Sequence, residues 1–340
     1  MAEANDRIGD EAALTERLTA PTTATRTAVA ALDGDVLVLG AGGKMGPNLV
    51  ELLVRAGGRR VIAVSRFSDA SHRDYLERVG ADTVVADLLE EEAMSALPDA
   101  ANVFILAGYK FGSTANEAAT WATNALLPAN AVARFRHSRI VYLSSGNVYP
   151  FTPVDGQGSS ETDDPAPVGE YAQSRLGGDR LVAFKSATTG AAVVTVRLFY
   201  ATELRYGIIH DVVTKVAREQ VIDLSMGHVN QIWQGDALNY MAQMFPLCAS
   251  PAAVINLTGP EILRIRSIAA QAGALLGKEP VFTGVESETA LLGNCAKLVE
   301  LYGQPETAPD RIIEWMVEWV KEGGRSLGKP TGYEKRTGKF

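Results

Sequence analysis

A tyrosine and an arginine one helical turn apart are the first residues whose types and spacing suggest chemistry. Tyr171 and Arg175 lie four positions apart, a spacing that places two side chains on one face of a helix. A phenol has a pKa of about 10 in water and acts as a base near neutral pH only where a nearby cation stabilises the phenolate. Ser145 follows an apolar segment typical of a strand, where its hydroxyl can hydrogen-bond a substrate oxygen. These residues predict proton transfer at a hydroxyl or carbonyl group, although Tyr171 and Arg175 alone also fit an ordinary pair on a helix face.

A glycine-rich turn predicts a binding site for a dinucleotide. The segment Gly40-Ala41-Gly42-Gly43-Lys44-Met45-Gly46 stands between the apolar run 36–39 and a helical pattern. In such a turn the first glycine permits the tight bend, the second lets a pyrophosphate approach the backbone, and the third lets helix and strand pack closely. The amides at the start of the helix then bind the diphosphate. A purely structural turn is the alternative, but the strand–turn–helix context favours a nicotinamide dinucleotide, with which hydride transfer would accompany the proton transfer.

The residues after the second strand indicate which dinucleotide binds. An acidic residue about twenty positions after the turn would bind the adenosine ribose hydroxyls and repel a 2′-phosphate. The chain has Ser65 and Arg66 there, and no acid before Asp69. Arginine binds phosphate oxygens through two parallel charge-assisted hydrogen bonds, and Lys44 in the turn offers a second positive charge. We therefore expect NADP, with NAD as the alternative cofactor and a solvated Arg66 as the alternative interpretation of that residue.

Apolar strands that alternate with helical patterns position these residues. The strand segments are continuous apolar runs, which predict a parallel sheet buried on both faces. They occupy residues 36–39, 61–64, 83–85, 103–106, 140–143 and 192–196. Helical patterns separate them, notably over 117–135 and 169–185. We expect an α/β fold with a doubly wound (Rossmann) parallel sheet, whose ligands bind beyond the carboxyl ends of the strands.

The alternation of strands and helices ends after Leu198. Helical patterns then predict a smaller, mostly helical C-terminal substrate lobe that covers the strand ends, with helices near residues 208–219, 236–247, 262–276, 288–302 and 312–321. We expect four parts along the chain: an N-terminal helical extension over 1–32 with a short helix near 10–18, a dinucleotide-binding domain over 33–200, the lobe over 201–323, and a basic, solvated and weakly ordered tail over 324–340.

The order and spacing of several motifs resemble those of the extended short-chain dehydrogenase/reductases, the family of NAD-dependent epimerases and dehydratases. The motifs are the glycine turn, Ala86-Asp87-Leu88, Ala107-Gly108, Asn124, Ser144-Ser145-Gly146-Asn147-Val148-Tyr149 and Tyr171-Ala172-Gln173-Ser174-Arg175. The resemblance spans roughly residues 35–320. The combination of motifs is much more specific than any one of them.

The resemblance implies roles for individual residues. Tyr171 matches the general acid/base and Ser145 the catalytic serine or threonine. Asn124 would order a water or support the backbone of the active site, its alternative being an exposed polar residue of a helix. The cofactor-binding residues would be Asp87 and Leu88 at the adenine, Ala107 and Gly108 at the nicotinamide ribose, and Gly40, Gly43, Lys44, Met45, Gly46, Ser65, Arg66, Tyr171, Arg175 and Leu198. The chain departs from the family at Arg175, where the family has lysine. An arginine keeps the positive charge and can hold ribose hydroxyls, but it cannot relay a proton.

Three absences relative to that family indicate a small substrate. No carboxyl group follows Ser145, where the dehydratases have an Asp-Glu pair, so elimination of water is not expected. Tyr200 stands where nucleotide-sugar members usually have asparagine, and Val229-Asn230-Gln231 replaces an arginine that would bind a diphosphate. We expect a free sugar, a sugar acid or a polyol, with Lys110, Tyr200 and Trp233 as candidate substrate-binding residues. The alternatives are core packing for the two aromatic side chains and a solvated position for the lysine.

Three functions are consistent with this pattern. The first is an NAD(P)-dependent oxidoreductase that transfers hydride to or from a small hydroxyl or carbonyl substrate. The second is a sugar epimerase that keeps its nicotinamide bound and oxidises its substrate transiently, and net reduction of added cofactor would separate the two. The third is a non-catalytic NADP-binding sensor, suggested by the loss of the family lysine and opposed by the retention of Ser145, Tyr171 and a cation.

The composition of the 340-residue chain excludes several classes of protein. No apolar run approaches the ~20 residues that a membrane-spanning helix needs, and a net charge of −8 opposes generic nucleic-acid binding. The 2 cysteines are too few for a disulfide framework, and the 4 histidines form no short-range ligand pair, so no metal site is expected. The first residues lack the pattern of a signal peptide, which predicts a cytoplasmic protein. The resemblance implies a homodimer formed through the helices over 117–135 and 169–185.

Overall fold

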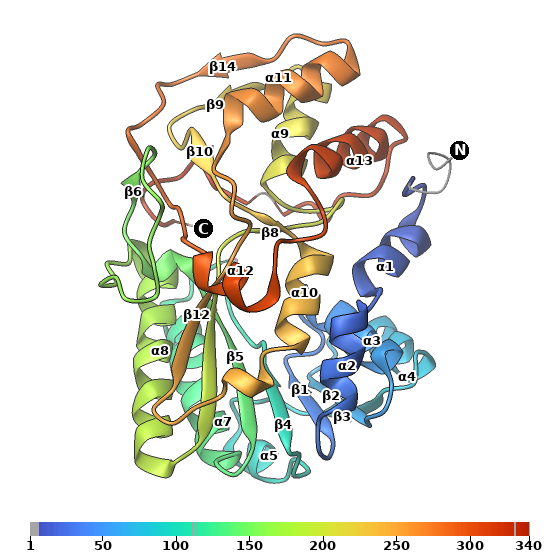
Figure 1. The fold of residues 1–340 in the computed structure, drawn as a ribbon, viewed down its shortest axis with the longest axis vertical. Helices are drawn as coiled ribbons and strands as arrows, with labels where there is room; N and C mark the ends of the chain where they lie inside the picture. The colour runs from blue at the N-terminus through green and yellow to red at the C-terminus, as the bar shows by residue number, and fades with distance from the viewer. Residues whose placement is uncertain (1–6, 111, 114, 330, 340) are drawn as a thin grey trace.

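A seven-stranded parallel sheet forms the centre of the molecule (Figure 1). The computed structural model describes residues 7–110, 112–113, 115–329 and 331–339. The strands of the sheet are β1 Val36–Leu39, β2 Val61–Ser65, β3 Asp82–Val85, β4 Asn102–Ile105, β5 Arg139–Ser145, β7 Ala192–Leu198 and β12 Ala253–Leu257. They lie in the order β12-β7-β5-β4-β1-β2-β3, and every neighbouring pair is parallel. The expected doubly wound α/β fold is confirmed, and β12 adds a strand that the sequence pattern did not single out.

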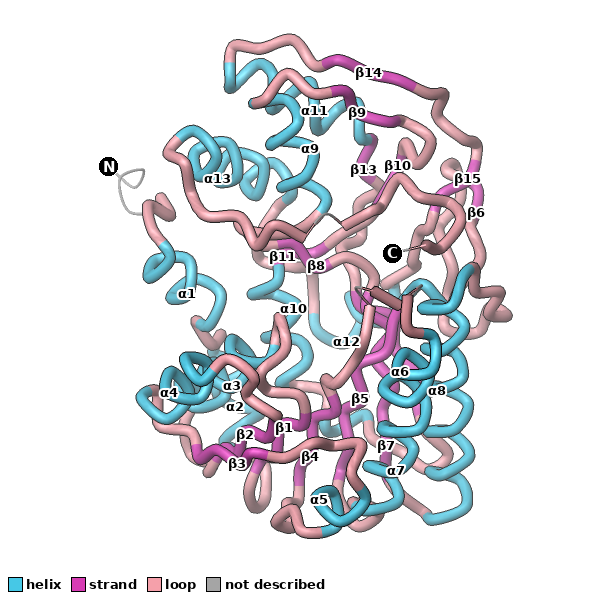
Figure 2. The backbone as a smooth tube through the Cα atoms, turned by 180° about the vertical axis from the view of Figure 1, so that it is seen from behind, coloured by secondary structure: helices cyan, strands magenta, loops and turns pink. Residues whose placement is uncertain are grey.

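Helices cover both faces of the sheet, because successive residues of a strand point to opposite sides. In β1, Val36 and Val38 belong to one apolar cluster, and Leu37 and Leu39 belong to another. The helices that pack around the sheet are α3 Gly46–Ala56, α4 Ala70–Arg78, α5 Glu91–Ser95, α7 Leu127–Arg134, α8 Gly169–Thr189 and α10 Gln234–Ala242. The first cluster includes buried residues of α3 and α10, and the second includes residues of α5, α7 and α8. Figure 2 shows α7 and α8 side by side over the second face.

The helical pattern over 117–135 forms three consecutive helical segments. They are α6 Glu117–Trp121, a π-helical turn over Ala122–Leu126, and α7. A π-helical turn changes the direction of the side chains on one helix face, and such turns are frequent at functional sites. Asn124 lies in the middle of this turn and is completely buried.

The chain reverses its direction along the sheet between β1 and β4. From β1 the strand order runs to β2 and β3, and from β4 it runs the other way to β5, β7 and β12. The connections after β1 and β4 therefore leave the sheet on opposite faces and open a crevice beyond the strand ends. Residues 40–46 and 106–110 form the two sides of this crevice.

Most of the second half of the chain forms a smaller lobe above the strand ends (Figure 1). Its helices are α9 Ile208–Ala217, α11 Ile265–Leu276 and α13 Pro309–Lys321, which pack together around a separate apolar cluster. Its short strands are β8 Ala201–Thr202, β9 Val221–Asp223, β10 His228–Val229, β11 Ile232–Trp233, β13 Leu263–Arg264 and β14 Val281–Thr283. Although α10 and β12 come from the same part of the chain, they pack with the sheet.

The helix expected over 288–302 is only partly present. Thr289–Ala290 forms β15, which pairs antiparallel with β6, Thr152–Pro153, and only Ala296–Tyr302 is helical, as α12. Gly293 between them lies against the ring of Phe199, where a Cβ atom would collide with ring carbons. The spacing of the apolar residues predicts a helix here, but the strand pairing of β15 and the contact of Gly293 with Phe199 keep the first part of the segment from being helical.

Two short helices precede the sheet. The expected helix near 10–18 is confirmed as α1, Glu11–Thr19, which begins where the Asp10 carboxylate accepts a hydrogen bond from the Ala13 amide at 2.8 Å. A second helix, α2, covers Thr23–Ala30 and packs on α3 and α10. Residues 1–6, on which the signal-peptide interpretation depends, lie outside the described part of the chain.

The last residues do not form the solvated tail that their charge predicts. We call residues 324–339, except for residue 330, which is not described, the C-terminal strap. Thr331 and Tyr333 are each only 2% exposed, and Tyr333 belongs to the apolar cluster of the lobe. The expectation of a weakly ordered extension is therefore wrong, because the basic side chains flank buried anchor residues.

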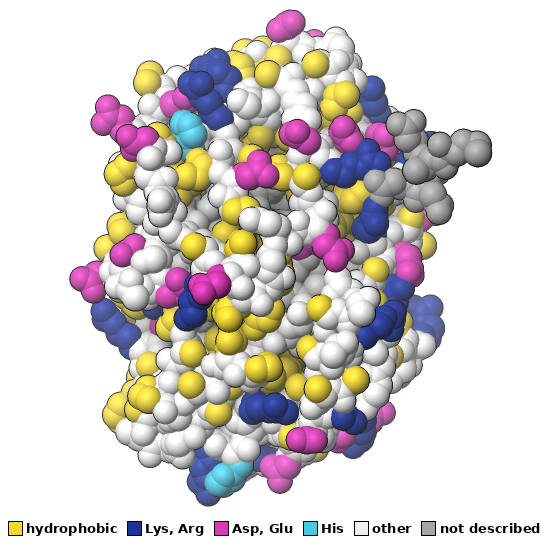
Figure 3. Space-filling view, in the orientation of Figure 1, with side chains coloured by type: hydrophobic (Ala, Val, Ile, Leu, Met, Phe, Trp, Pro, Cys, Tyr) yellow, Lys and Arg dark blue, Asp and Glu magenta, His cyan; other side chains and the backbone are white. Residues whose placement is uncertain are grey.

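The surface seen in Figure 3 carries acidic and basic side chains interspersed over both lobes. None of the helices that the structure describes has the length and apolar character needed to span a membrane.

Candidate active site

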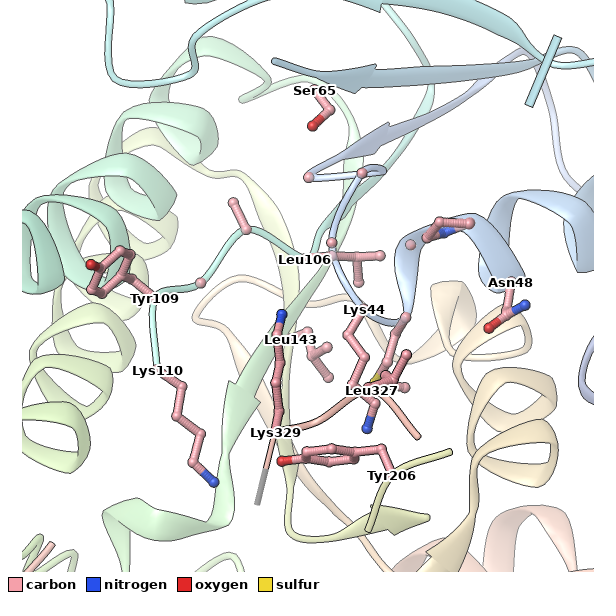
Figure 4. Close-up of a pocket in the computed structure, with 18 of the residues that line it drawn as sticks. Lys44, Asn48, Ser65, Leu106, Tyr109, Lys110, Leu143, Tyr206, Leu327 and Lys329 are labelled. Atoms are coloured by element: carbon pink, nitrogen blue, oxygen red, sulfur yellow. The ribbon is translucent and has the colours of Figure 1, made fainter. Parts of the chain in front are cut away.

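A cleft of about 1210 Å³ lies beyond the carboxyl ends of the strands (Figure 4). The glycine turn after β1 forms one wall. Gly40 has φ +89°, and a Cβ atom there would lie 2.6 Å from the amide nitrogen of Ala107. A Cβ at Gly46 would collide with the backbone of Ala41. Glycine is required at both positions, so the turn passes close to β4 and exposes its backbone to the cleft.

One end of the cleft is lined by the residues expected to bind adenosine. Ser65, Arg66, Asp87 and Leu88 all line it, as do Ala107, Gly108 and Leu198 nearer the centre. The Arg66 side chain is 68% exposed, and its guanidinium lies 3.8 Å from the Asp87 carboxylate. Arg66 is thus close to an acid while remaining accessible to a ligand.

Lys44 lines the cleft but does not extend toward Arg66. Its ammonium donates to the carbonyl of Ala201 at 3.4 Å and lies 3.6 Å from the ring centre of Tyr206. Figure 4 shows Lys44 and Ser65 pointing in different directions. The side chain is open to the cleft along its length, while desolvation of the ammonium lowers its pKa to about 7. The expectation that Lys44 adds a second charge beside Arg66 is therefore wrong in this structure.

Ser145 and Tyr171 line the same cleft from neighbouring elements. Ser145 is the last residue of β5, and its hydroxyl oxygen accepts a hydrogen bond from the Asn147 amide at 3.2 Å. This contact begins a short 3₁₀ turn over Gly146–Val148 and fixes the serine at the strand end. Tyr171 lies in the first turn of α8, which Gly169 begins.

Arg175 is anchored to the strand ends. Only 3% of it is exposed, and its guanidinium donates to the carbonyl of Leu143 and, at 3.4 Å, to the side-chain oxygen of Asn124. A Cβ at Gly108 would lie 3.0 Å from one of its terminal nitrogens. Burial of the guanidinium acts to lower its pKa, but electrostatic interactions with Tyr142, Tyr171 and Asp179 outweigh this effect, so the pKa of Arg175 is raised.

Asn124 supports the backbone of the cleft wall. It binds both backbone groups of Tyr109, accepting from the amide at 2.8 Å and donating to the carbonyl at 2.9 Å. It also donates to the Ser174 hydroxyl at 2.9 Å. Of the two expectations for Asn124, the structure has the supporting role and not the exposed helix position.

A buried polar network lies behind Ser145. The Arg197 guanidinium donates to Asp179 at 3.0 Å and to the Tyr149 hydroxyl at 2.6 Å. The Tyr149 hydroxyl donates to Asn256 at 3.0 Å, and the Ser144 hydroxyl donates to Asp179. Desolvation raises the pKa of Asp179, against the opposing effect of Arg197. The motif analysis did not find this network, because its members come from β5, α8, β7 and β12.

The other end of the cleft is lined by lysines and tyrosines. The Lys110 ammonium lies 5.8 Å from the ring centre of Tyr171, and desolvation lowers its pKa to about 8. Tyr200 and Tyr206 line the same end, and burial raises the pKa of each phenol above its usual value. Trp233 does not reach the cleft: it is 1% exposed and packs at 5.4 Å on Trp315 in the core of the lobe. The expectation that Trp233 binds substrate is wrong.

Several lining residues were not found from the sequence. Arg205 and Tyr206 follow β8, and Arg325, Leu327 and Lys329 belong to the C-terminal strap. None of the motifs that carry the resemblance to the family includes any of them. The strap reaches the cleft only through tertiary packing, so its distance in sequence from every other site residue hid its position.

Comparison with known proteins identifies the family of the chain. The sequence profile of the NAD dependent epimerase/dehydratase family matches residues 36–231. Similar solved structures include MoeE5 in complex with UDP-glucose and NAD (22% identity, TM-score 0.66, 85% of this chain and 99% of that one). A UDP-glucose 4-epimerase from Thermotoga maritima (17%, 0.71, 85% and 99%) and a UDP-glucuronic acid 4-epimerase from Bacillus cereus in complex with NAD (15%, 0.70, 86% and 99%) share the fold. No curated protein matches the chain in sequence. The match over residues 36–231 establishes that the chain belongs to the NAD dependent epimerase/dehydratase family and is an enzyme of that family.

Proposed function

We propose that the protein is a nicotinamide-dependent oxidoreductase that oxidises or reduces a hydroxyl or carbonyl group of a small sugar, sugar acid or polyol. The observation that carries this proposal is that Tyr171, Ser145 and the glycine turn line one cleft at the point where the strand order reverses. This crevice is where open α/β sheets bind dinucleotides.

The cleft fits the dinucleotide that the family uses. Gly40 and Gly46 lie where a Cβ atom would collide with backbone, so the backbone of the turn can approach a pyrophosphate closely. At the start of α3 the Gly46 amide donates to the Gly43 carbonyl and Pro47 has no amide hydrogen, so Asn48 carries the next amide of the helix. Ala107, Gly108 and Leu198 offer small or apolar surfaces near the centre. When bound, the dinucleotide supplies the hydride acceptor or donor. Ser65 and Arg66 favour NADP, because a guanidinium binds a 2′-phosphate more strongly than a ribose hydroxyl.

Each residue of the site has a distinct task in this proposal. Tyr171 takes the proton from a substrate hydroxyl, or returns it to a carbonyl oxygen. Ser145 donates a hydrogen bond to the same oxygen. Arg175 places a positive charge beside the phenolate that forms at Tyr171, and Asn124 holds the arginine and the loop at Tyr109 in place. Because a guanidinium does not release its proton, the proton of Tyr171 exchanges with solvent by another path.

A sugar epimerase is the second candidate function, and membership of the epimerase/dehydratase family supports it. An epimerase uses the same transfer in both directions on one bound substrate. Gly146 and Asn147 follow Ser145 without a carboxyl group, so the acid and base of a dehydratase are absent at these two positions.

We further propose that the protein forms a homodimer through α6, the π-helical turn and α8. Large apolar side chains are exposed on these elements: Trp121 is 40% exposed, Leu126 52%, Leu181 41% and Phe184 59%. The three elements pack against one another. Exposed apolar side chains gathered on adjoining elements are typical of an interface.

A cofactor titration followed by a substrate screen tests the proposed function. NADPH and NADH are titrated by fluorescence, and sugars, sugar acids and polyols are then screened for a change in nicotinamide absorbance. We expect tight binding of NADPH, turnover of at least one compound, and a loss of about 10²–10⁴-fold in kcat for Tyr171→Phe with unchanged cofactor affinity. Absence of dinucleotide binding, or full activity of Tyr171→Phe, would contradict the proposal. Interconversion of two sugars without net cofactor reduction would instead identify the epimerase.

A further inference from the structure

Asn147 holds the hydroxyl of Ser145 at the wall of the cleft. The Ser145 hydroxyl donates to the side-chain oxygen of Asn147 at 3.2 Å, and its own oxygen accepts from the Asn147 backbone amide at 3.2 Å. Both residues line the cleft, and Asn147 is the more accessible of the two, since Ser145 is only 4% exposed. The short turn after β5 therefore places two neighbouring polar oxygens at the cleft.

The turn that carries Asn147 is fixed from behind by an aromatic pair. A Cβ atom at Gly146 would collide with the ring of Phe199, so the backbone of the turn packs directly on this ring. The Phe199 ring stacks on Tyr149 with 5.9 Å between the ring centres, and the Tyr149 hydroxyl belongs to the buried polar network behind Ser145. Because Gly146 has no side chain, Asn147 is the first residue after Ser145 that offers a polar side chain to the cleft. Packing thus determines where its carboxamide lies, as a specific contact requires.

The hydrogen bond between these two side chains has to change when a substrate binds. A hydroxyl group has a single proton, so Ser145 cannot donate to Asn147 and to a substrate oxygen at the same time. In the reaction proposed above, Ser145 donates to the oxygen on which Tyr171 acts. Its proton then leaves the Asn147 oxygen, and a shielded acceptor that loses its donor costs free energy. A hydroxyl of the substrate that donates to Asn147 removes this cost.

We propose that Asn147 is a specificity-determining residue whose side-chain oxygen accepts a hydrogen bond from a second hydroxyl of the substrate, on the carbon next to the reacting one. The substrate is then a vicinal diol, as in a sugar or a polyol, and not an isolated alcohol. The inference rests on the proposed function, which identifies the oxygen that Ser145 binds. Hydroxyls on neighbouring carbons can each bond one of two protein atoms that are themselves a hydrogen-bond length apart, and the two side-chain oxygens lie at 3.2 Å. An ether or a hydrogen on the second carbon offers no proton, so Asn147 selects against both.

Ring alcohols that differ at one carbon test this selection. The oxidation of cyclohexanol, of cis- and trans-cyclohexane-1,2-diol and of trans-2-methoxycyclohexanol by NADP⁺ is followed by nicotinamide absorbance. We expect kcat/KM for at least one diol to exceed that for cyclohexanol by about tenfold or more, because a site built to bind a hydroxyl rejects the analogue that lacks it. The methoxy compound keeps the second oxygen but cannot donate, so its kcat/KM should not exceed that of cyclohexanol. Equal values for all of these compounds, absence of turnover included, overturn the inference, as does a methoxy compound that reacts as well as the diols.

Two variants of Asn147 assign the selection to its side-chain oxygen. Asn147→Leu is close in size and removes the acceptor, so the preference for the diol over cyclohexanol should disappear. Asn147→Asp keeps an acceptor oxygen and should keep most of the preference. Asn130→Leu is the matched control, because Asn130 is an exposed residue of α7 that does not line the cleft. A merely structural change lowers kcat/KM for both compounds alike, so a preference that survives Asn147→Leu overturns the assignment.

Failure of this inference is distinguishable from failure of the proposed function. NADPH affinity is measured by fluorescence for each protein, and it should be the same for Asn147→Leu and Asn130→Leu. Turnover of any compound that depends on Tyr171, without a preference for a diol, leaves the proposed oxidoreductase in place and removes the specificity role of Asn147. Absence of dinucleotide binding by the unaltered protein contradicts the proposed function itself.

Discussion

The Arg197 guanidinium donates to the Asp179 carboxylate at 3.0 Å, and both side chains are less than a tenth exposed. The pair lies between β7 and α8, directly behind the strand that ends at Ser145. It therefore connects the helix that carries Tyr171 to the sheet that carries Ser145. A buried pair of this kind is costly to form, but removing one partner is more costly, since the other charge is left without compensation.

The first prediction concerns this pair and the stability of the fold. Asp179→Ala should lower the free energy of unfolding by about 3–5 kcal/mol, because it leaves the Arg197 charge buried. Arg197→Met should also destabilise, and the double variant should lose less than the sum of the two, with a coupling of about 1–3 kcal/mol. Denaturant unfolding measures all three. Arg180→Met, next in sequence and exposed, is the control and should change stability by less than about 0.5 kcal/mol. Strict additivity would contradict the interpretation.

The second prediction concerns Arg175 and its neighbour Gly108. Arg175→Met should lower kcat by about 10²-fold, because it removes the charge beside Tyr171 and the contacts with Leu143 and Asn124. Arg175→Lys keeps the charge without the forked geometry, so its kcat should lie between that of the unaltered enzyme and that of Arg175→Met. Gly108→Ala places a Cβ 3.0 Å from the guanidinium, so it should slow the unaltered enzyme.

The combination of these changes gives the sharper measurement. Lysine is shorter than arginine and leaves the space beside position 108, so Gly108→Ala should cost less in the Arg175→Lys background. Steady-state kcat and NADPH affinity are measured in parallel for the unaltered enzyme, Gly108→Ala, Arg175→Lys and the double variant. A kcat for Arg175→Met equal to that of the unaltered enzyme would exclude an electrostatic role for this arginine.

The strands and the glycine turn were predictable because their physical causes are local. Parallel strands buried on both faces appear as continuous apolar runs, and this predicted six of the seven strands of the sheet. The missed strand, β12, contains Asn256, a buried polar residue whose partner is the Tyr149 hydroxyl. A search for apolar runs does not find a strand that contains a buried polar residue, because the hydrogen bond that makes its burial possible comes from a distant part of the chain.

The candidate site divides in the same way. The positions of Ser145 and Tyr171 in the cleft follow from strand ends and helix spacing, and the structure has both lining it. Lys329 and the pair Asp179–Arg197 depend on contacts between segments far apart in sequence. Lys44 was assigned to the wrong neighbour because a position in a turn does not determine the direction of a long side chain. The strap was expected in solvent because its composition is dominated by basic residues. Composition alone does not reveal that two of its residues, Thr331 and Tyr333, are buried.

The third prediction concerns the choice of dinucleotide. Arg66→Ala should weaken NADPH binding about ten- to a hundredfold and leave NADH binding nearly unchanged, because only NADPH carries the 2′-phosphate. The effect should shrink at high salt, since the side chain is largely exposed. Fluorescence titration measures the two dissociation constants. Arg73→Ala is the control, as Arg73 is also exposed and pairs with Glu77 in α4. Equal weakening of both dinucleotides would contradict the assignment of Arg66.

The fourth prediction concerns the proposed dimer. Phe184→Asp places a charge on the exposed apolar side chain of α8, and it should convert the dimer to a monomer because burying an unpaired carboxylate is costly. Sedimentation velocity distinguishes the two states. Val285→Asp is the control, since Val285 is 84% exposed on the lobe, away from α8. A monomeric parent protein, or a dimer that tolerates Phe184→Asp, would rule out this interface.

The fifth prediction concerns pH and follows from Lys110. Desolvation lowers the pKa of this amine to about 8, so it is cationic below that pH and neutral above it. An anionic substrate stabilises the cationic form, so its affinity should be highest below about pH 8 and should fall as pH rises. Asp211 acts to raise the pKa of Lys110, against the desolvation that lowers it. Lys44, at the other wall of the cleft, has a pKa of about 7 and therefore loses its proton at a lower pH than Lys110.

Two variants at this position separate the role of Lys110 from the other titrating groups. Lys110→Arg keeps its charge at every accessible pH, so the affinity for the anion should stay high beyond pH 8. Lys110→Met has no charge at any pH, so its affinity should be low throughout and lack the decline near pH 8. The dependence of kcat/KM on pH, measured with a sugar acid as substrate, reports the free enzyme. The same decline in all three proteins would assign the titration to a group other than Lys110.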